Sequence, residues 1–285
     1  MIENSVVVLG GGGIWGAAWM TGIIMGLAEH GVDLAQAQRF IGTSAGAMVG
    51  AQLARGHSMT ELFIRQTDPT KQPREHPPRP KGLAPLIELL QQQWESPEAR
   101  RRAIAALALN AEMIDASQHR ADVIERLGEA SNEWPTRVLS VTAVDTATCE
   151  LCVFNRQSGV GLIEAVAASC AVPGVSPPMR INGRLYMDGG LWRNGENVHL
   201  ACGERLVLII SPFGVWAQSL QADIEELRQS GSRVALIAAD DQELSTLGPF
   251  GPLDPSFRAA AAEAGRDHGH REAEKIHAWL GGTHP

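Results

Sequence analysis

Basic residues and cysteines are scarce in this sequence, and the shortage of basic residues limits the ligands that the protein can bind. Lysine and arginine together number 24 against 32 aspartates and glutamates, so the formal net charge is −8. A nucleic-acid-binding surface needs a dense basic stripe to neutralise phosphates. The charge balance therefore excludes this class, and we expect no nucleic-acid partner.

The four cysteines do not complete a metal or redox motif. Cys149 and Cys152 form one C-x-x-C pair, but no second pair of ligands accompanies it, as a zinc site requires. The pair also falls in a strand-like run, where neighbouring side chains point to opposite faces. We therefore expect reduced thiols in a cytoplasmic protein, with neither a metal nor another cofactor.

A charge-free run over residues 5–28 is long enough to suggest a signal peptide or a membrane span. The preceding residues 1–4 contain Glu3 and no basic residue, unlike a secretory signal. Four consecutive glycines at 10–13 would also disrupt a helix in lipid. The run instead predicts a strand, a glycine turn and a buried helix.

Strand-like and helix-like apolar patterns alternate along the chain, which predicts an α/β protein. Strands are expected at residues 6–9, 39–42, 137–144, 149–154, 184–187, 206–210 and 234–238. Helices are expected at residues 15–29, in a run ending near 55, and at 86–94, 97–113, 121–130 and 255–280. Ser96 is the expected N-cap of the helix that starts at Pro97.

Six prolines in the segment 67–85 predict an irregular connection there. We interpret residues 57–134 as this proline-rich connection followed by a helical cap, inserted between sheet elements. With 44% apolar and 20% charged residues, the composition is that of an ordinary globular protein. Residues 1–285 are therefore expected to form a single domain.

Residues 42–46 read Gly-Thr-Ser-Ala-Gly, a G-x-S-x-G sequence between a short strand and a helix. A serine hydroxyl becomes a useful nucleophile when a sharp turn exposes it beside a base and backbone N–H donors. The following helix also directs the positive end of its dipole toward the turn. Ser44 is therefore the candidate nucleophile, and a serine that merely caps the helix is the plainer alternative.

Residues 10–16 contain a G-x-G-x-x-G pattern at Gly11, Gly13 and Gly16. One interpretation is a dinucleotide-binding turn, which needs an acidic residue at the end of a second strand. Glu29 and Asp33 have the right spacing, but the residues before them continue a helix. The other interpretation is an oxyanion hole, because consecutive glycines let several N–H groups converge.

Asp188 directly follows a strand-like segment and precedes Gly189 and Gly190. An Asp-Gly sequence is common in ordinary turns. Together with an exposed serine and a glycine-rich N–H cradle, however, this carboxylate completes the groups that acyl transfer requires: nucleophile, base and oxyanion donors.

These three motifs, with Ala-Ser-Cys-Ala-Val-Pro at 168–173, resemble those of the patatin-like phospholipase family over residues 5–56 and 137–211. The resemblance implies a three-layer α/β/α sandwich with a mainly parallel central sheet and an inserted helical cap. It implies a catalytic dyad of Ser44 and Asp188. It also implies an oxyanion hole formed at Gly11, Gly12, Gly13 and Ala45. The remaining motif glycines are Gly16, Gly42, Gly46, Gly189 and Gly190.

The chain departs from the family pattern at two places. Trp15 stands where the family usually has arginine or lysine, and Asn194 is followed by Gly195-Glu196 where the family often has N-x-P. Backbone donors do not depend on the side chain, but the first change removes a cation. Ester hydrolysis is therefore better supported than a preference for an anionic phospholipid head group.

The resemblance implies a serine lipid acyl hydrolase that cleaves carboxylic esters of phospholipids or other acyl lipids through an acyl-enzyme. Alternatives are a small-ester or thioester hydrolase or acyltransferase on the same dyad, and a nucleotide-binding protein. A triad that includes His199, His268 or His270 is the mechanistic rival. Apolar spacing in the cap, with arginines at 100–102, also suggests transient contact with a membrane surface, which the acidic net charge opposes.

Overall fold

One eight-stranded sheet runs through the centre of the molecule, in the order β5-β6-β3-β2-β1-β7-β8 with β4 paired to β3. The computed structural model describes residues 2–75, 80–111, 113–128, 131–193, 195–214, 218–248 and 251–281. The strands are β1 (Val6–Leu9), β2 (Arg39–Thr43), β3 (Val138–Asp145), β4 (Leu151–Phe154), β5 (Met179–Ile181), β6 (Arg184–Asp188), β7 (Leu206–Ser211) and β8 (Arg233–Ala238).

The central part of the sheet is parallel and one side of it is antiparallel. Strands β2, β1, β7 and β8 pair in parallel, as does β3 with β2, whereas β4, β5 and β6 make antiparallel pairs. The parallel strands are runs of β-branched and other apolar residues, as strands buried on both faces require. All four residues of β1 are buried.

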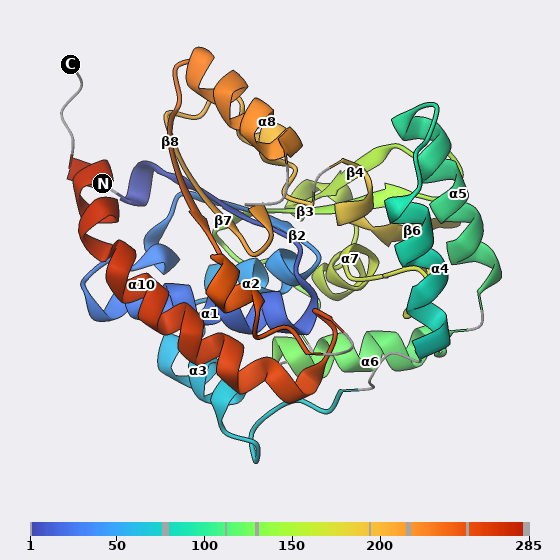
Figure 1. Ribbon diagram of the computed structural model, residues 1–285, viewed down its shortest axis with the longest axis horizontal. Coiled ribbons are helices and arrows are strands. Elements are labelled where there is room, and N and C mark those ends of the chain that lie inside the picture. The colour runs from blue at the N-terminus through green and yellow to red at the C-terminus, as the bar shows by residue number, and fades with distance from the viewer. Residues whose placement is uncertain are drawn as a thin grey trace.

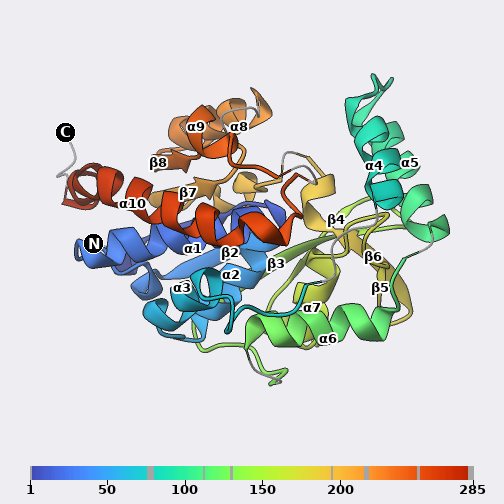
Figure 2. The ribbon, with the colours of Figure 1, turned by 60° about the horizontal axis from the view of Figure 1, so that its bottom comes forward.

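Alternate side chains of the strands enter two different cores. On β1, Val7 and Leu9 join the core formed with α1 (Gly13–Glu29), α2 (Ala45–Ala54), α7 (Leu162–Ser169) and α10 (Arg258–Gly281). Val6 and Val8 pack on the other face with α8 (Gln218–Gln229) and the short η5 (Val198–Ala201). Figures 1 and 2 show the sheet between these two helical layers. The predicted three-layer α/β/α sandwich is confirmed.

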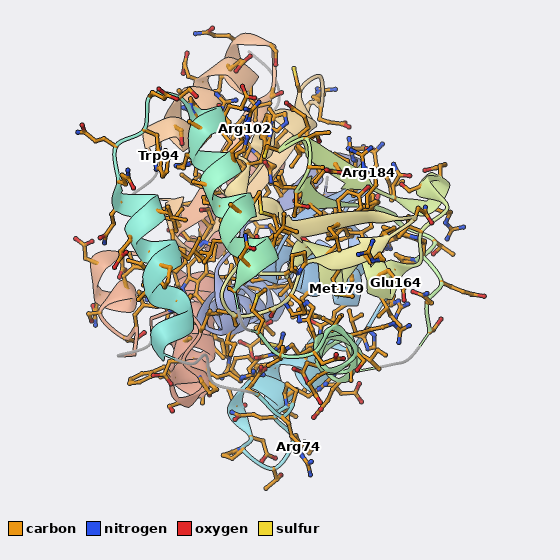
Figure 3. All side chains as sticks on the ribbon, turned by 90° about the vertical axis from the view of Figure 1, so that its right-hand side faces the viewer. Arg74, Trp94, Arg102, Glu164, Met179 and Arg184 are labelled. Atoms are coloured by element: carbon orange, nitrogen blue, oxygen red, sulfur yellow. The ribbon has the colours of Figure 1, made fainter. Side chains whose placement is uncertain are left out.

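Residues 57–134 hold four helices that pack in different places: α3 (Met59–Thr67), α4 (Pro80–Gln91), α5 (Pro97–Asn110) and α6 (Ala116–Leu127). Helix α3 contacts α1 and α10, while α6 contacts α7 and α2. Helices α4 and α5 lie side by side (Figure 3), and their apolar residues pack with Val144 and Met187 of the sheet. The helices of this segment therefore lie on both faces of the sheet.

The proline-rich connection is shorter than predicted. Helix α4 begins at Pro80 and contains Pro85, although we expected irregular structure through residue 85. Proline fits the first turn of a helix, where its missing N–H has no intrahelical acceptor, and one further proline removes a single hydrogen bond. Part of the connection, residues 76–79, lies outside the described residues. The predicted N-cap at Ser96 is confirmed, since its hydroxyl accepts from the Ala99 N–H at 3.1 Å.

Strand β4 starts later than predicted, at Leu151, because Cys149 has a left-handed backbone with φ of 59° and lies in the turn before it. All four cysteines are free thiols. Of the helices that the structure describes, none is both long and apolar enough to cross a lipid bilayer.

Candidate active site

Ser44 lies on a strained turn between β2 and α2. Its backbone has φ of 53° and ψ of −118°, in a region that side-chain-bearing residues seldom adopt. Such a conformation costs on the order of 1–3 kcal/mol and persists only where the surroundings enforce it. Gly46 allows the turn to pack closely, because a Cβ there would lie 2.0 Å from the Leu9 carbonyl oxygen. Strand, turn and helix thus have the local geometry that the sequence predicts around Ser44.

Strand pairing brings Asp188 to the same edge of the sheet as Ser44. Strand β3 lies between β2 and β6. Thr43, the residue before Ser44, pairs with Thr142, and the next residue of β3, Ala143, pairs with Asp188. The two candidate residues therefore flank one strand from opposite sides.

The carboxylate of Asp188 is deeply buried, and only one of its oxygens has a hydrogen-bond donor among the described residues. Oδ1 accepts from the Gly190 N–H at 2.8 Å, whereas the buried Oδ2 has no hydrogen-bond partner. Burial raises the pKa of Asp188 to about 6, although the nearby Ser44 hydroxyl and the Gly190 N–H both lower it. Oδ2 is thus the carboxylate oxygen that remains to accept a hydrogen bond. The Ser44 hydroxyl lies close enough to lower the pKa of this carboxylate.

The last residue of α7 and the loop that follows it contact the backbone of both candidate residues. The Ser169 hydroxyl accepts from the Ser44 N–H at 2.8 Å, and the Ala171 carbonyl accepts from the Asp188 N–H at 2.9 Å. The Cys170 thiol contacts the Ser44 carbonyl oxygen at 3.3 Å. Burial raises the pKa of that thiol to about 12, so it stays protonated and is no competing nucleophile. The Ala-Ser-Cys-Ala-Val-Pro motif at 168–173 is visible in the sequence, but no local pattern there indicates that it positions Ser44 and Asp188.

A second positioning residue, Asn197, was missed in the sequence. Its side-chain amide donates to the hydroxyls of Thr43 and Thr142 at 3.1 and 3.3 Å and to the Gly189 carbonyl at 3.2 Å. The residue is fully buried. It therefore links the strand end before Ser44 to the turn after Asp188. The D-G-G-x-x-x-N pattern drew attention to Asn194, which lies outside the described residues.

The glycine loop between β1 and α1 lies beside the serine. A Cβ on Gly11 would be 3.7 Å from the Ser44 Cβ. The Gly11 N–H, however, already donates to the Gly195 carbonyl at 3.1 Å. The N–H groups of Gly12, Gly13 and Ala45 precede or open helices, where amides have no intrahelical acceptor, and no bond to a described residue occupies them.

The other motif glycines are required by close packing. A Cβ would lie within 3.0 Å of a neighbouring atom at Gly16, Gly42 and Gly189, and its contacts would be Pro212, the Gly46 carbonyl and the Thr142 carbonyl. At Gly190 a Cβ would lie 3.1 Å from the Asp188 carboxylate. These positions keep the three loops close together.

The histidines of the rival triad are engaged elsewhere. His268 hydrogen-bonds Glu243 at 2.9 Å, His270 hydrogen-bonds Glu29 at 2.5 Å, and His199 packs against the Trp192 ring. Among the described residues that line the cavity at Ser44, there is no histidine. The side chain at Trp15 points into the core, where it stacks on Trp19 and Phe213.

The acidic residues of the nucleotide-binding alternative are also placed elsewhere. Glu29 ends α1 and pairs with Arg266, and Asp33 caps a short 3-10 helix. Strand β2 ends at Thr43, so neither carboxylate stands at a strand end to hold a ribose.

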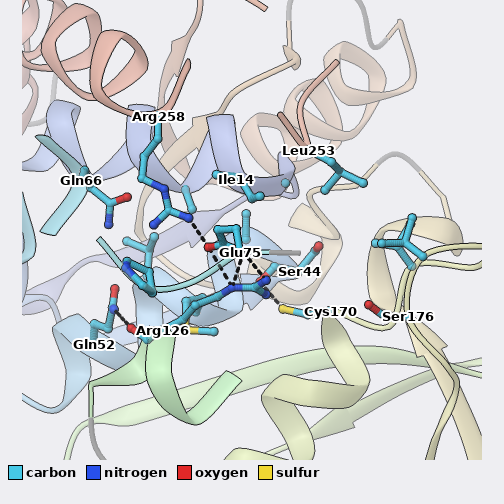
Figure 4. A pocket seen from close by; sticks show the side chains of 18 of the residues that line it. Ile14, Ser44, Gln52, Gln66, Glu75, Arg126, Cys170, Ser176, Leu253 and Arg258 are labelled. Carbon is cyan, nitrogen blue, oxygen red and sulfur yellow. Dashed lines mark hydrogen bonds and ion pairs between the residues drawn. The ribbon is translucent and has the colours of Figure 1, made fainter. Parts of the chain in front are cut away.

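A cavity opens at Ser44 and has walls of two kinds. Apolar residues form one part, namely Ile14, Ala17, Ala45, Met48, Val49, Val172, Val175 and Leu253. Polar and charged residues form the other part, namely Gln52, Arg65, Gln66, Glu75, Arg126 and Arg258. In Figure 4, Ile14 and Leu253 lie toward the Ser44 side, with Gln52 and Gln66 at the opposite end.

Comparison with known families agrees with this geometry. The profile described as "Patatin-like phospholipase" matches residues 7–201, which include the glycine loop, the elbow and Asp188. The chain belongs to the patatin-like phospholipase family. Helix α10, whose first residue Arg258 lines the cavity, lies beyond the matched segment.

Solved structures of larger bacterial proteins match nearly the whole of this chain at low sequence identity. VipD from Legionella pneumophila is 16% identical, with a TM-score of 0.49, and the match covers 96% of this chain and 67% of that one. ExoU from Pseudomonas aeruginosa, in complex with SpcU, is 17% identical, with a TM-score of 0.41, over 98% of this chain and 53% of that one. This chain thus spans about half the length of the ExoU structure. No curated protein matches.

Proposed function

We propose that the protein is a serine lipid acyl hydrolase that works through an acyl-enzyme on Ser44. The main support is that the strained turn at Ser44 lies at the same edge of the sheet as the buried carboxylate of Asp188, one of whose oxygens has no hydrogen-bond partner among the described residues. Family membership supports hydrolysis of acyl lipids as the reaction class. The apolar walls of the cavity suit an acyl chain.

In the proposed mechanism, Oδ2 of Asp188 takes the proton of the Ser44 hydroxyl as its oxygen attacks the ester carbonyl carbon. The tetrahedral intermediate collapses, the C–O bond to the alcohol breaks, and the proton on Asp188 passes to the leaving alcohol. Water then attacks the acyl-serine and gives one proton to Asp188. As the C–O bond to Ser44 breaks, that proton passes to the Ser44 oxygen, which releases the carboxylic acid and regenerates the free serine and the Asp188 carboxylate. A carboxylate with a pKa of about 6 is ionised at neutral pH and still basic enough for this role.

The oxyanion is assigned to the amides of Gly12, Gly13 and Ala45. No described residue accepts a hydrogen bond from these three groups, whereas the Gly11 N–H donates to the Gly195 carbonyl. We therefore leave Gly11 out of the predicted set and give it the role of holding the loop beside Ser44. Loss of one such donor typically slows acyl transfer by about 100- to 1,000-fold.

The alternative on the same dyad is a small-ester or thioester hydrolase or an acyltransferase. It differs in the substrate, since the nucleophile and base are the same. The number of apolar residues along the cavity favours acyl chains over short esters. Rates on nitrophenyl esters of increasing chain length and on intact phospholipids separate these alternatives.

Transient contact with a membrane surface is part of the proposal. Ile87 and Leu90 on α4 and Leu109 on α5 are exposed apolar side chains that can enter a lipid interface. The arginines at 100–102 contribute less than the sequence suggested. Two of them donate to backbone carbonyls, Arg100 to Arg193 and Arg101 to Cys149, and Arg102 pairs with Glu98.

The test is ester hydrolysis by Ser44→Ala and Asp188→Ala, with Ser245→Ala as a control at an exposed helix end. We expect both site variants to lose at least 1,000-fold in kcat/KM and the control to match the wild type. If Asp188→Ala stays active and a variant at His199 or His268 does not, the dyad is wrong. If no ester is hydrolysed by the wild-type protein, the function is wrong.

A further inference from the structure

Three arginines and one glutamate gather at the polar end of the cavity that contains Ser44. Arg65, Arg126 and Arg258 line it together with Glu75. Glu75 lies between two of the guanidinium groups and is paired with both Arg126 and Arg258 (Figure 4). The side chains of Glu75 and Arg258 are each 4% exposed. The ionised groups lining this end thus carry more positive than negative charge.

Arg258 is buried and paired with Glu75, whereas the side chain of Arg126 is 26% exposed, so the excess positive charge faces the cavity and is not sealed in the core. Burial and the charges of Arg126 and Arg65 lower the pKa of Arg258, against the attraction of Glu75. Asp122, one helical turn before Arg126 on α6, offsets part of the excess but does not line the cavity. Along the cavity wall, one carboxylate, that of Glu75, is therefore the counter-ion for three guanidinium groups. Such a site is stabilised when an anion enters.

Arg126 and Arg258 each have N–H groups left to donate to a ligand. Arg126 uses Nε and one terminal nitrogen on Glu75, and Arg258 uses one terminal nitrogen on it. A guanidinium carries five N–H groups, and no described residue accepts from the others. Arg65 is less available, since it donates to the Glu125 carbonyl at the end of α6.

The cluster is held rigidly. Arg126 is on α6, and its backbone carbonyl accepts from the Gln52 amide at 2.7 Å. Arg258 begins α10, which packs against α1 so closely that a Cβ on Gly22 would lie 2.0 Å from the Ala262 carbonyl. Fixed donors lose little conformational entropy on binding, which favours a specific ligand.

The cluster also acts on the groups around the serine. The charge of Arg126 lowers the pKa of the Cys170 thiol, whose sulfur contacts the Ser44 carbonyl. Arg126 is thus within electrostatic range of the nucleophile elbow. An ester with its carbonyl at Ser44 and its acyl chain along the apolar wall would direct its remaining substituent toward Arg126 and Arg258, which line the same cavity.

We propose that this cavity selects esters that carry an anionic group, a phosphate or a carboxylate, bound by Arg126 and Arg258. The inference rests on the proposed function and specifies its substrate class. The cation missing from the glycine loop at Trp15 is then supplied by α6 and α10. A purely structural role, in which Glu75 ties α6 to α10, predicts no preference among ligands.

The first test measures binding without turnover. Ser44→Ala protein is titrated with decyl phosphate, decanoate and decanol, which share a chain and differ in the head. We expect at least tenfold tighter binding of one anion than of decanol, and the tighter anion identifies the source of the charge. Equal binding of all three overturns the inference, and this result needs no substitution in the cluster.

The second test adds Arg126→Gln in the same Ser44→Ala background. We expect it to remove most of the anion preference, while Arg120→Gln leaves it unchanged. Arg120 is a matched control because it is also on α6 and paired with a carboxylate, Glu164, but does not line the cavity. Anion preference that survives Arg126→Gln, with the variant folded by circular dichroism, contradicts the assignment.

Kinetics with wild-type protein separate the two proposals. Hydrolysis of a monoacylglycerol is compared with that of its phosphate and its succinate esters. Ester hydrolysis without an anionic preference overturns the anion site and leaves the proposed function standing. Anion binding by Ser44→Ala, with no hydrolysis of any ester by the wild type, overturns the proposed function and leaves the anion site standing.

Discussion

Asp188→Asn should stabilise the folded protein while abolishing its activity. In the unfolded chain an aspartate has a pKa of about 4, and burial raises it to about 6 in the fold. Ionising Asp188 therefore costs the folded state about 3 kcal/mol at pH 7, at about 1.4 kcal/mol for each pKa unit. Asparagine keeps the shape and the acceptor for the Gly190 N–H, and removes the charge.

The pH dependence gives the sign of this effect. Because the folded protein binds the Asp188 proton more tightly than the unfolded chain does, the wild type loses stability as the pH rises from about 4 to about 6. Above this window the loss is complete and constant. The difference in free energy of unfolding between Asp188→Asn and wild type should thus grow by about 3 kcal/mol across the window.

Urea denaturation of both proteins at several pH values from 3.5 to 8, a range set by those two pKa values, measures this difference. Groups elsewhere that titrate in this range cancel in the comparison. A difference that stays constant with pH, or that favours the wild type increasingly as the pH rises, would refute the account of Asp188 as a buried base whose ionisation destabilises the fold. Loss of esterase activity in the same variant gives the functional half of the result.

Three further predictions follow from the site. With the wild type, kcat/KM should rise about tenfold for each pH unit below about 6 and level off above it, because Asp188 must be ionised to act as base; a profile flat down to pH 4.5 contradicts this. Gly46→Ala should lower the melting temperature strongly, whereas Gly50→Ala on the same helix, where the nearest atom is a leucine side chain at 3.4 Å, should not; equal melting temperatures are the contrary result. Asn197→Ala should reduce kcat by about tenfold or more with little change in KM, since it loosens both turns without touching the cavity; a change in KM alone would argue against a positioning role.

The predictable parts of the site are those with local signals. A strand followed by G-x-S-x-G and a helix predicts the Ser44 elbow, because the turn needs small residues on both sides. Asp188 at a strand end followed by glycines is predictable in the same way. That the two meet depends on β6 pairing antiparallel with β3, which no local pattern states.

The positioning residues and the charged end of the cavity depend on long-range contacts. Asn197 reaches Thr43 across more than 150 positions of sequence, and in the sequence it is an ordinary loop asparagine. Glu75 lies in the proline-rich connection and meets Arg258 from the last helix. Each residue taken alone looks like a solvated surface charge, so only the fold reveals the cluster.

The most direct test of the account is covalent labelling with a fluorophosphonate, followed by peptide mapping. This probe reacts with serines that are activated as nucleophiles, and the cavity holds a second serine, Ser176, as an internal comparison. We predict that the label appears on Ser44 and that Asp188→Ala slows labelling strongly. Label on Ser176, or no label on a protein that hydrolyses esters, would contradict the assignment of Ser44 as the nucleophile.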